Sequence, residues 1–278
     1  MSIPKKIHYC WFGKNKLPER LSMCIKTWKA IMPDYDIICW DETNFDINSV
    51  PFVEETCRAK KYGFTVDYLR LYALYNHGGI YLDTDVVVKK PFDSFLNDDL
   101  FSAIEYHPSL IKKKNTFSLL NEKGIPKNIS IGVPGIGMLV AIMGATKEHP
   151  FIKECMDFYT KYHFILPNGD YNMKVAPAIY AEIAAKYGFC YQDRLQRIEH
   201  GMVFYPSAFF AGETEQFTED SYALHYCENS WRDKTIFEKM KGELAKINML
   251  RKLLGKEQYK DLEKIIREIL PESKKTST

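Results

Sequence analysis

The stretch LYNHGGIYLDTDV, residues 74–86, decides the fold of this chain of 278 residues. Apolar residues at helical spacing predict a helix over Thr65–His77, and the two glycines that follow would end it. Ile80–Leu82 then predict a short buried strand. We expect this strand to carry Asp83 and Asp85 at its carboxyl end, which is where ligands bind in open parallel sheets.

Strands and helices alternate on both sides of this stretch. Before it, the pattern predicts strands at 6–12 and 35–40 and helices at 18–32 and 52–60. After it, the pattern predicts a surface loop at 112–128, a small helix at 138–145, helices at 150–161 and 177–187, and strands near 202–205 and 222–226. Such alternation is typical of the α/β class, with a mostly parallel central sheet flanked by helices.

The chain divides by composition into a body and a tail. Residues 1–233 form the predicted catalytic domain, and two basic amphipathic helices are predicted in the tail at 234–278. The tail holds 12 Lys and Arg against 7 Asp and Glu, so its charge is +5 and the rest of the chain carries −3 of the net +2. Such a tail is suited to peripheral contact with the inner face of a membrane, but also to packing on the body or to dimer formation.

The near-neutral net charge gives no reason to expect nucleic acid as a partner. The seven cysteines are odd in number and form no CxxC pair, which indicates reduced thiols rather than disulfides or a zinc site. The sequence has no apolar stretch long enough for a signal peptide or a membrane span. We therefore expect a cytoplasmic protein that is at most peripheral to a membrane.

Asp83 and Asp85 have the chemistry of a divalent-cation site. Two carboxylates at i and i+2 on extended chain lie on the same side and repel each other, and a hard cation removes that repulsion. Mg²⁺ and Mn²⁺ prefer oxygen ligands and are completed by substrate phosphates, so a metal-bridged diphosphate becomes a good leaving group. Asp-Xaa-Asp alone is a weak signal, because many such pairs are solvated turns.

Three further features have both a functional and a structural interpretation. Asp67 and Arg70, at i and i+3 of the predicted helix, suit the binding of sugar hydroxyls or phosphate, but also an ordinary intrahelical ion pair. His225, before the run 228–231, suits a metal shell or a packed core position. Trp11, after the first strand, can stack on a nucleobase or lie in the core.

Taken together, these residues resemble the DXD-containing sugar transferases of glycosyltransferase family 32. These are relatives of the yeast-type initiating mannosyltransferases and, more distantly, of the glucosylating bacterial toxins. The matching segments are 3–13, 33–35 with Trp28 and Trp40, 67–70, 74–86, and 225–231. The resemblance is continuous from residue 3 to about residue 95, is loose in the middle of the chain, and does not extend to the tail. It implies a single Rossmann-like fold of the GT-A type, a divalent metal, and retention at the anomeric carbon.

The resemblance also implies roles for individual residues. Asp67 and Arg70 would hold the sugar hydroxyls of the donor, and Asp83 would contact its ribose or sugar. Trp11 would stack on the base, and the donor site would include Tyr9. The diphosphate and metal contacts would come from a further set: Asp85 and Asp83 on the metal, His225 with Asn229 or Ser230 completing its shell, and Trp231 and Ser230 at the donor diphosphate.

One residue departs from the family pattern. The family usually has Ser directly before the helix Asp, where this chain has Val66, so a hydroxyl contact there is lost or shifted. The identity of the donor is therefore less constrained than the fold.

The sequence thus predicts a retaining hexosyltransferase that uses Mn²⁺ or Mg²⁺ and a nucleotide-sugar donor, expected to be a UDP-sugar. Its acceptor would be a saccharide or lipid-linked saccharide in the synthesis of a surface polysaccharide such as a capsule, or of a glycolipid. Two alternatives remain open at this point. One is a metal-dependent nucleotide-sugar hydrolase, and the other is a non-catalytic carbohydrate-binding or scaffold protein.

Overall fold

The computed structural model describes residues 2–128, 132–212 and 216–226. The predicted tail at 234–278 and the predicted site residues Asn229, Ser230 and Trp231 lie outside these ranges. Within them, none of the helices is both long and apolar enough to cross a bilayer.

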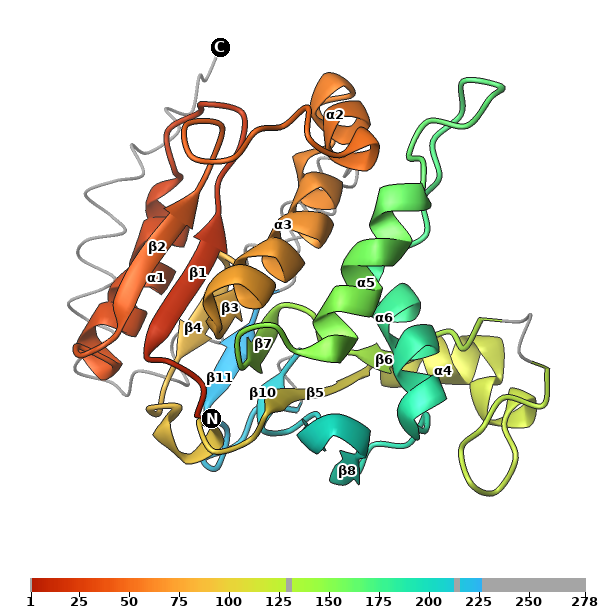
Figure 1. The fold of residues 1–278 in the computed structure, drawn as a ribbon. Coiled ribbons are helices and arrows are strands. Elements are labelled where there is room, and N and C mark those ends of the chain that lie inside the picture. Colours follow the sequence, from red (N-terminus) through yellow and green to blue (C-terminus); the bar gives the residue numbers. More distant parts are fainter. Residues whose placement is uncertain (1, 129–131, 213–215, 227–278) are drawn as a thin grey trace, which may run out of the picture. The chain divides into compact units, whose positions relative to one another are not determined.

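The centre of the described residues is an eight-stranded mixed sheet (Figure 1). Along its main path lie β2 (Asp36–Trp40), β1 (Lys6–Cys10), β3 (Gly79–Leu82), β7 (Ile142–Ala145), β5 (Leu100–Tyr106), β9 (Met202–Tyr205) and β8 (Gln196–Ile198), and β6 (Ile136–Met138) pairs with β5. The pairings make β2, β1, β3, β5 and β9 run in one direction and β7, β6 and β8 in the other. Most strands are therefore parallel in direction, and the predicted α/β class with a helix-flanked sheet is confirmed.

Two hydrophobic clusters cover the two faces of this sheet. On one face pack α2 (Pro51–Arg58), α3 (Tyr62–His77), α5 (Pro150–Lys161) and α6 (Ala176–Ala184). On the other pack α1 (Glu19–Ile31) and a second sheet of β10 (Phe210–Ala211), β11 (Ala223–His225) and β4 (Val86–Val88). The side chains of β3 alternate between the two faces. Tyr81 packs in the first cluster, and Ile80 and Leu82 pack in the second. Figure 1 shows α3 and α5 side by side over the sheet.

Proline begins several of these helices. A Pro occupies the first turn of α2, α5 and α6, where its missing N–H removes no helical hydrogen bond. The remaining elements are α4 (Pro108–Lys114) and four 3₁₀ turns at Asp93–Phe95, Thr116–Leu119, Ala185–Tyr187 and Glu199–Gly201.

Two predictions for the middle of the chain were wrong. The apolar run 138–145 is not a small helix but the end of β6 and the whole of β7, and β7 lies between β3 and β5. A short apolar run fits either a helix or a strand. Here the glycine allows the close approach of β5, because a Cβ on Gly144 would lie 2.1 Å from a ring carbon of Phe101. The segment 112–128 is not a plain loop, because it contains the end of α4 and the turn Thr116–Leu119.

A buried histidine fixes the start of β3. Gly78 and Gly79 both have positive φ, 60° and 111°, and so end α3 without the strain of a side chain. His8 is fully buried, with Nε2 2.8 Å from the Gly78 carbonyl oxygen, and Nδ1 accepts a hydrogen bond from Trp40 Nε1 at 3.2 Å. The ring is therefore neutral, donates from Nε2, and holds the turn that leads into the Asp83–Asp85 segment.

Burial lowers the pKa of His8 to about 4, and the nearby His77 and Lys6 act in the same direction. The unfolded chain binds a proton near the ordinary pKa of about 6.5, so the folded state loses stability as pH falls from about 6.5 toward 4. We expect the loss from this group to be on the order of 3 kcal/mol. Urea unfolding at several pH values between about 6.5 and 4 measures this loss. The free energy of unfolding should fall less steeply with falling pH in His8→Gln than in wild type. Equal slopes in the two proteins would contradict the neutral, buried ring.

Candidate active site

The Asp83–Asp85 segment is a tight turn that joins β3 to β4, not the extended chain that the sequence predicted. The Asp83 N–H donates to the Ala141 carbonyl oxygen at 2.9 Å, and the Val86 N–H donates back to the Asp83 carbonyl oxygen at 3.1 Å. The turn transfers the chain from the large sheet to the small one. Both carboxylates consequently lie beside β11, the strand that pairs with β4.

His225 completes a cluster with the two aspartates. It ends β11, which is antiparallel to β4 and places His225 opposite Val86. Its Nε2 lies 3.2 Å from Asp85 Oδ1 and 3.8 Å from Asp83 Oδ2, and one ligand atom from each of the three residues lies within 4.8 Å of the others. Two carboxylates and an imidazole at this spacing fit one divalent cation of the Mn²⁺ type, with positions left for phosphate oxygens and water.

Arg70 links this turn to helix α3. Its side chain is 4% exposed, and its Nη1 donates to the Val140 carbonyl oxygen at 2.8 Å. Its Nη2 lies 3.5 Å from Asp83 Oδ1 and 3.3 Å from Asp67 Oδ1. One guanidinium therefore lies between both carboxylates, and the predicted intrahelical ion pair of Asp67 and Arg70 is present.

The carboxyl group of Asp67 is buried and has few partners. Its side chain is 10% exposed, and the ion pair with Arg70 is the contact that the described residues give it. Burial raises the pKa of Asp67 to about 7, against the lowering effect of Arg70, and Asp83 adds to the rise. A buried carboxyl group of this kind has hydrogen-bonding capacity left for a ligand hydroxyl.

Tyr81 is a site residue that the sequence analysis missed. Its hydroxyl donates to Asp83 Oδ1 at 2.7 Å, and the Arg70 guanidinium lies 4.9 Å from the centre of its ring. Tyr81 therefore holds the Asp83 carboxylate through its hydroxyl and the Arg70 guanidinium through its ring. The signal was available, because the sequence predicts one strand through Tyr81 and Asp83, and residues two apart on a strand lie on the same side.

Trp11 follows β1 at the same edge of the sheet as Asp83. Strands β1 and β3 are parallel, with Ile7 beside Ile80 and His8 beside Tyr81, so their carboxyl ends coincide. The backbone N–H of Trp11 donates to the Trp40 carbonyl oxygen at 2.9 Å. The indole of Trp11 is half-buried, and its Nε1 donates to the Asn15 carbonyl oxygen.

The position of Tyr9 differs from that of Trp11. Its ring packs edge-on against Trp28, with centroids 5.8 Å apart, in the second hydrophobic cluster. Trp28 in turn donates from Nε1 to the Val86 carbonyl oxygen, directly after the turn. Tyr9 therefore supports the turn through Trp28, and the described contacts do not bring it to the carboxylates.

Part of the site, namely Asp67, Arg70, Asp83 and Asp85, lies in a segment that matches a known family. Residues 18–102 match the family described as the glycosyltransferase sugar-binding region containing DXD motif. The inositol phosphoceramide mannosyltransferases 3 and 2 of Schizosaccharomyces pombe are 26% and 24% identical to this chain over 171 and 243 residues. These alignments cover 59% and 83% of this chain but 40% and 59% of the relatives, so the chain spans about half of their length.

Among solved structures, the PaToxG glycosyltransferase is 19% identical with a TM-score of 0.46. That match covers 66% of this chain and 70% of the other. Residues 18–102 are thus similar to the DXD-containing sugar-binding region of glycosyltransferases, and the Asp83–Asp85 turn lies within the matched residues.

Proposed function

We propose that residues 1–233 form a retaining, metal-dependent hexosyltransferase. It would move a hexose from a nucleotide-diphosphate sugar, expected to be a UDP-sugar, to a saccharide or lipid-linked saccharide acceptor in the synthesis of surface polysaccharide or glycolipid. The observation that carries the proposal is the convergence of Asp83, Asp85 and His225 on one point beside the Arg70–Asp67 pair. The mannosyltransferase relatives are in accord with a hexose donor and a lipid-linked acceptor.

The residues divide into two groups by the part of the donor that each would hold. Asp83, Asp85 and His225 would bind Mn²⁺ or Mg²⁺, which when bound neutralises charge on the departing diphosphate. Asp67 offers carboxyl oxygens to sugar hydroxyls, and Arg70 keeps that carboxyl and Asp83 in place. Stabilisation of the leaving group is then the main catalytic effect, and no residue is assigned as a covalent nucleophile.

Donor turnover distinguishes this function from its alternatives. UDP-, GDP- and ADP-hexoses would be incubated with the protein, with Mn²⁺ or with chelator, and with or without a panel of saccharide acceptors. A transferase releases nucleotide fastest with metal and an acceptor, and it forms a new glycoside. Release that is metal-dependent but equal with and without every acceptor would indicate a hydrolase, and no release with any donor would favour a non-catalytic binding protein.

Trp11 is expected to contribute to nucleotide affinity through its base-stacking face. Stacking of a base on an aromatic side chain is worth about 1–3 kcal/mol, so Trp11→Ala should weaken nucleotide binding by about 10-fold or more. Trp11→Phe should recover part of the loss. Tyr171→Ala, which removes an exposed ring from another loop, serves as a control that should leave nucleotide affinity unchanged. Unchanged affinity in a folded Trp11→Ala protein would remove Trp11 from the donor site.

A further inference from the structure

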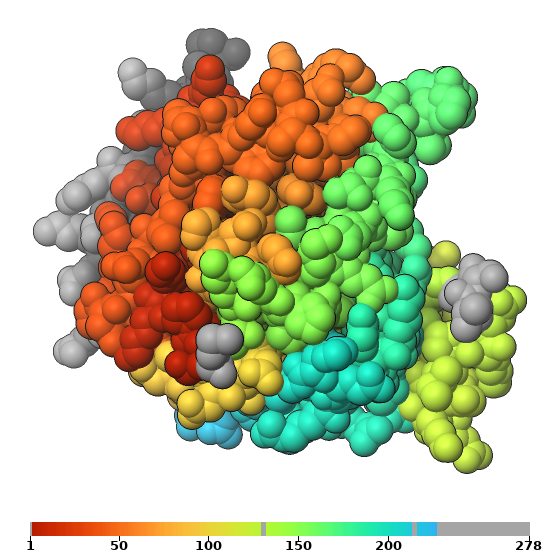
Figure 2. All heavy atoms as spheres, viewed as in Figure 1, coloured from red at the N-terminus to blue at the C-terminus, as the bar shows by residue number. Residues whose placement is uncertain are grey.

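A basic segment, residues 108–128, follows strand β5. It contains α4 and the 3₁₀ turn Thr116–Leu119, and Figure 2 shows it in yellow-green at one side of the molecule. Between residues 108 and 128 the chain has five lysines and one glutamate. Three of the lysines, at 112–114, lie in succession at the end of α4 and are exposed.

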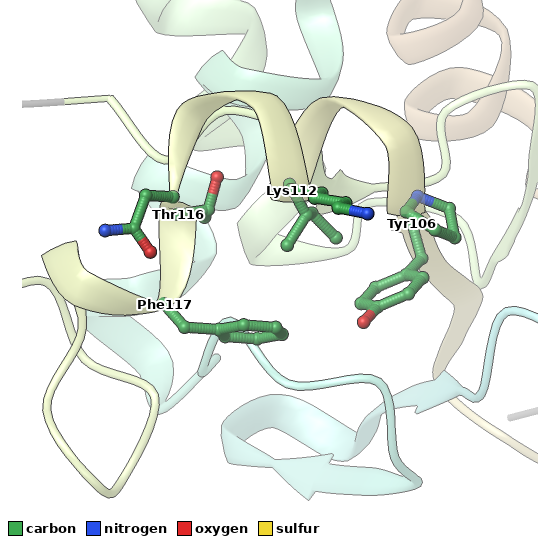
Figure 3. A pocket seen from close by; sticks show the side chains of 7 residues that line it. Tyr106, Lys112, Thr116 and Phe117 are labelled. Atoms are coloured by element: carbon green, nitrogen blue, oxygen red, sulfur yellow. The ribbon is translucent and has the colours of Figure 1, made fainter.

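This segment borders an open hollow of about 340 Å³ at the end of β5. Its lining consists of Tyr106, Pro108, Ile111, Lys112, Asn115, Thr116 and Phe117. Figure 3 shows the rings of Tyr106 and Phe117 facing the same space beneath the helix. Phe117 is 57% exposed among the residues that the structure describes, which leaves a large apolar surface on this ring.

The walls of the hollow are fixed by hydrogen bonds and close packing. The His107 N–H donates to the Gly135 carbonyl oxygen at 2.8 Å, and Thr116 Oγ1 donates to the Pro134 carbonyl oxygen at 2.6 Å. Gly135 has a φ of 83°, and a Cβ there would lie 2.9 Å from a side-chain carbon of Ile111. The helix is therefore held tightly on the segment that leads into β6, and the hollow does not depend on one flexible side chain.

The segment that holds the hollow also reaches the candidate active site. Strand β6 pairs with β5 at Ile136 and Tyr106, and the chain then continues to Val140, whose carbonyl oxygen accepts from Arg70, and Ala141, whose carbonyl oxygen accepts from the Asp83 N–H. Five residues of extended chain span at most about 17 Å. The inner end of the hollow therefore lies within reach of a saccharide that has its other end at Asp83.

The chemistry of the lining selects a charged sugar. An exposed aromatic ring can pack on the apolar face of a sugar ring, and the Tyr106 hydroxyl and Asn115 amide are groups that can bond sugar hydroxyls. The ammonium of Lys112, with two more lysines beside it, favours an anionic substituent such as a phosphate or carboxylate. We propose that this hollow is the acceptor subsite, and that it takes a sugar ring carrying an anionic group. The assignment rests on the transferase function proposed above.

The test is a saturation-transfer NMR titration of the full chain. The probes are methyl α-mannoside and methyl α-mannoside 6-phosphate, each with UDP and Mn²⁺ present. We expect the phosphorylated glycoside to bind more tightly. Phe117→Ala should weaken its binding by about 5- to 10-fold, and Lys112→Gln by up to about 5-fold. Nucleotide affinity should be unchanged in both variants.

Matched controls lie on other surfaces. Tyr171→Ala removes an exposed ring from another loop, and Lys161→Gln removes a charge from the end of α5, so neither should affect glycoside binding. No saturation transfer to either glycoside, equal binding of the two, or unchanged binding in Phe117→Ala would overturn the assignment. Absence of metal-dependent binding of UDP, GDP and ADP alike in wild type would instead contradict the proposed function, so the two failures are distinguishable.

Discussion

Asp85→Asn is expected to reduce sugar transfer by about 100-fold or more while leaving the fold intact. Its Oδ1 lies 3.2 Å from His225 Nε2, so the substitution removes one of the two charged oxygen ligands from the candidate metal position. The amide has almost the same shape, and the backbone bond from the Tyr226 N–H to the Asp85 carbonyl oxygen does not involve the side chain. Turnover of the labelled donor and the thermal unfolding midpoint measure the two effects separately.

The matched control for Asp85 is Asp36→Asn. Asp36 is exposed at the start of β2, at the opposite edge of the same sheet, and should lose neither activity nor stability. Turnover within about threefold of wild type in a folded Asp85→Asn protein would exclude the Asp83–Asp85 turn as the catalytic centre. An unfolded variant would instead be replaced in the test by His225→Gln, which removes the third ligand.

Arg70→Ala should have the largest effect on stability. The substitution leaves the carboxyl groups of Asp67 and Asp83 in a buried site without their shared cation, and it leaves the Val140 carbonyl oxygen without its donor. Removal of one partner from a buried ion pair costs about 3–5 kcal/mol. Urea unfolding at pH 7.5 measures the change in the free energy of unfolding.

The comparison variants for Arg70 separate charge from geometry. Arg70→Lys keeps the charge but cannot reach three acceptors at once, so we expect an intermediate loss of stability and a large loss of activity. Arg58→Ala breaks an exposed pair with Glu54 on α2 and should change stability by less than about 0.5 kcal/mol. A loss below about 1 kcal/mol in Arg70→Ala would show that the two carboxyl groups do not depend on this guanidinium.

The site was predictable from the sequence wherever local spacing determined it. Asp67 and Arg70 share a helix face, and the Asp83–Asp85 pair follows a buried strand, so both groups could be placed from period and position alone. His225 was a candidate from its residue type, but its contact with Asp85 depends on the pairing of β11 with β4. That pairing joins segments about 140 residues apart and has no local signal.

The fold was predictable in class but not in its middle strands. The alternating pattern before residue 90 predicted the strands and helices there, because most of them begin or end near Gly, Pro or Asp. Strand β7 was mistaken for a helix, because a short apolar run buried on both faces has no periodicity that distinguishes the two. The turn at Asp83–Asp85 was mistaken for extended chain for a related reason: Val86–Val88 continue the apolar pattern but belong to a different sheet.

The most direct test of the central claim is the heat of binding of UDP, GDP and ADP to the full chain, each with Mn²⁺ and with chelator. We predict that one of the three nucleotides binds with Mn²⁺, binds at least about 10-fold more weakly with chelator, and loses the metal-dependent part in Asp85→Asn. Binding of no nucleotide in the presence of metal, or equal binding with Mn²⁺ and chelator, would contradict a metal-dependent donor site at Asp83, Asp85 and His225.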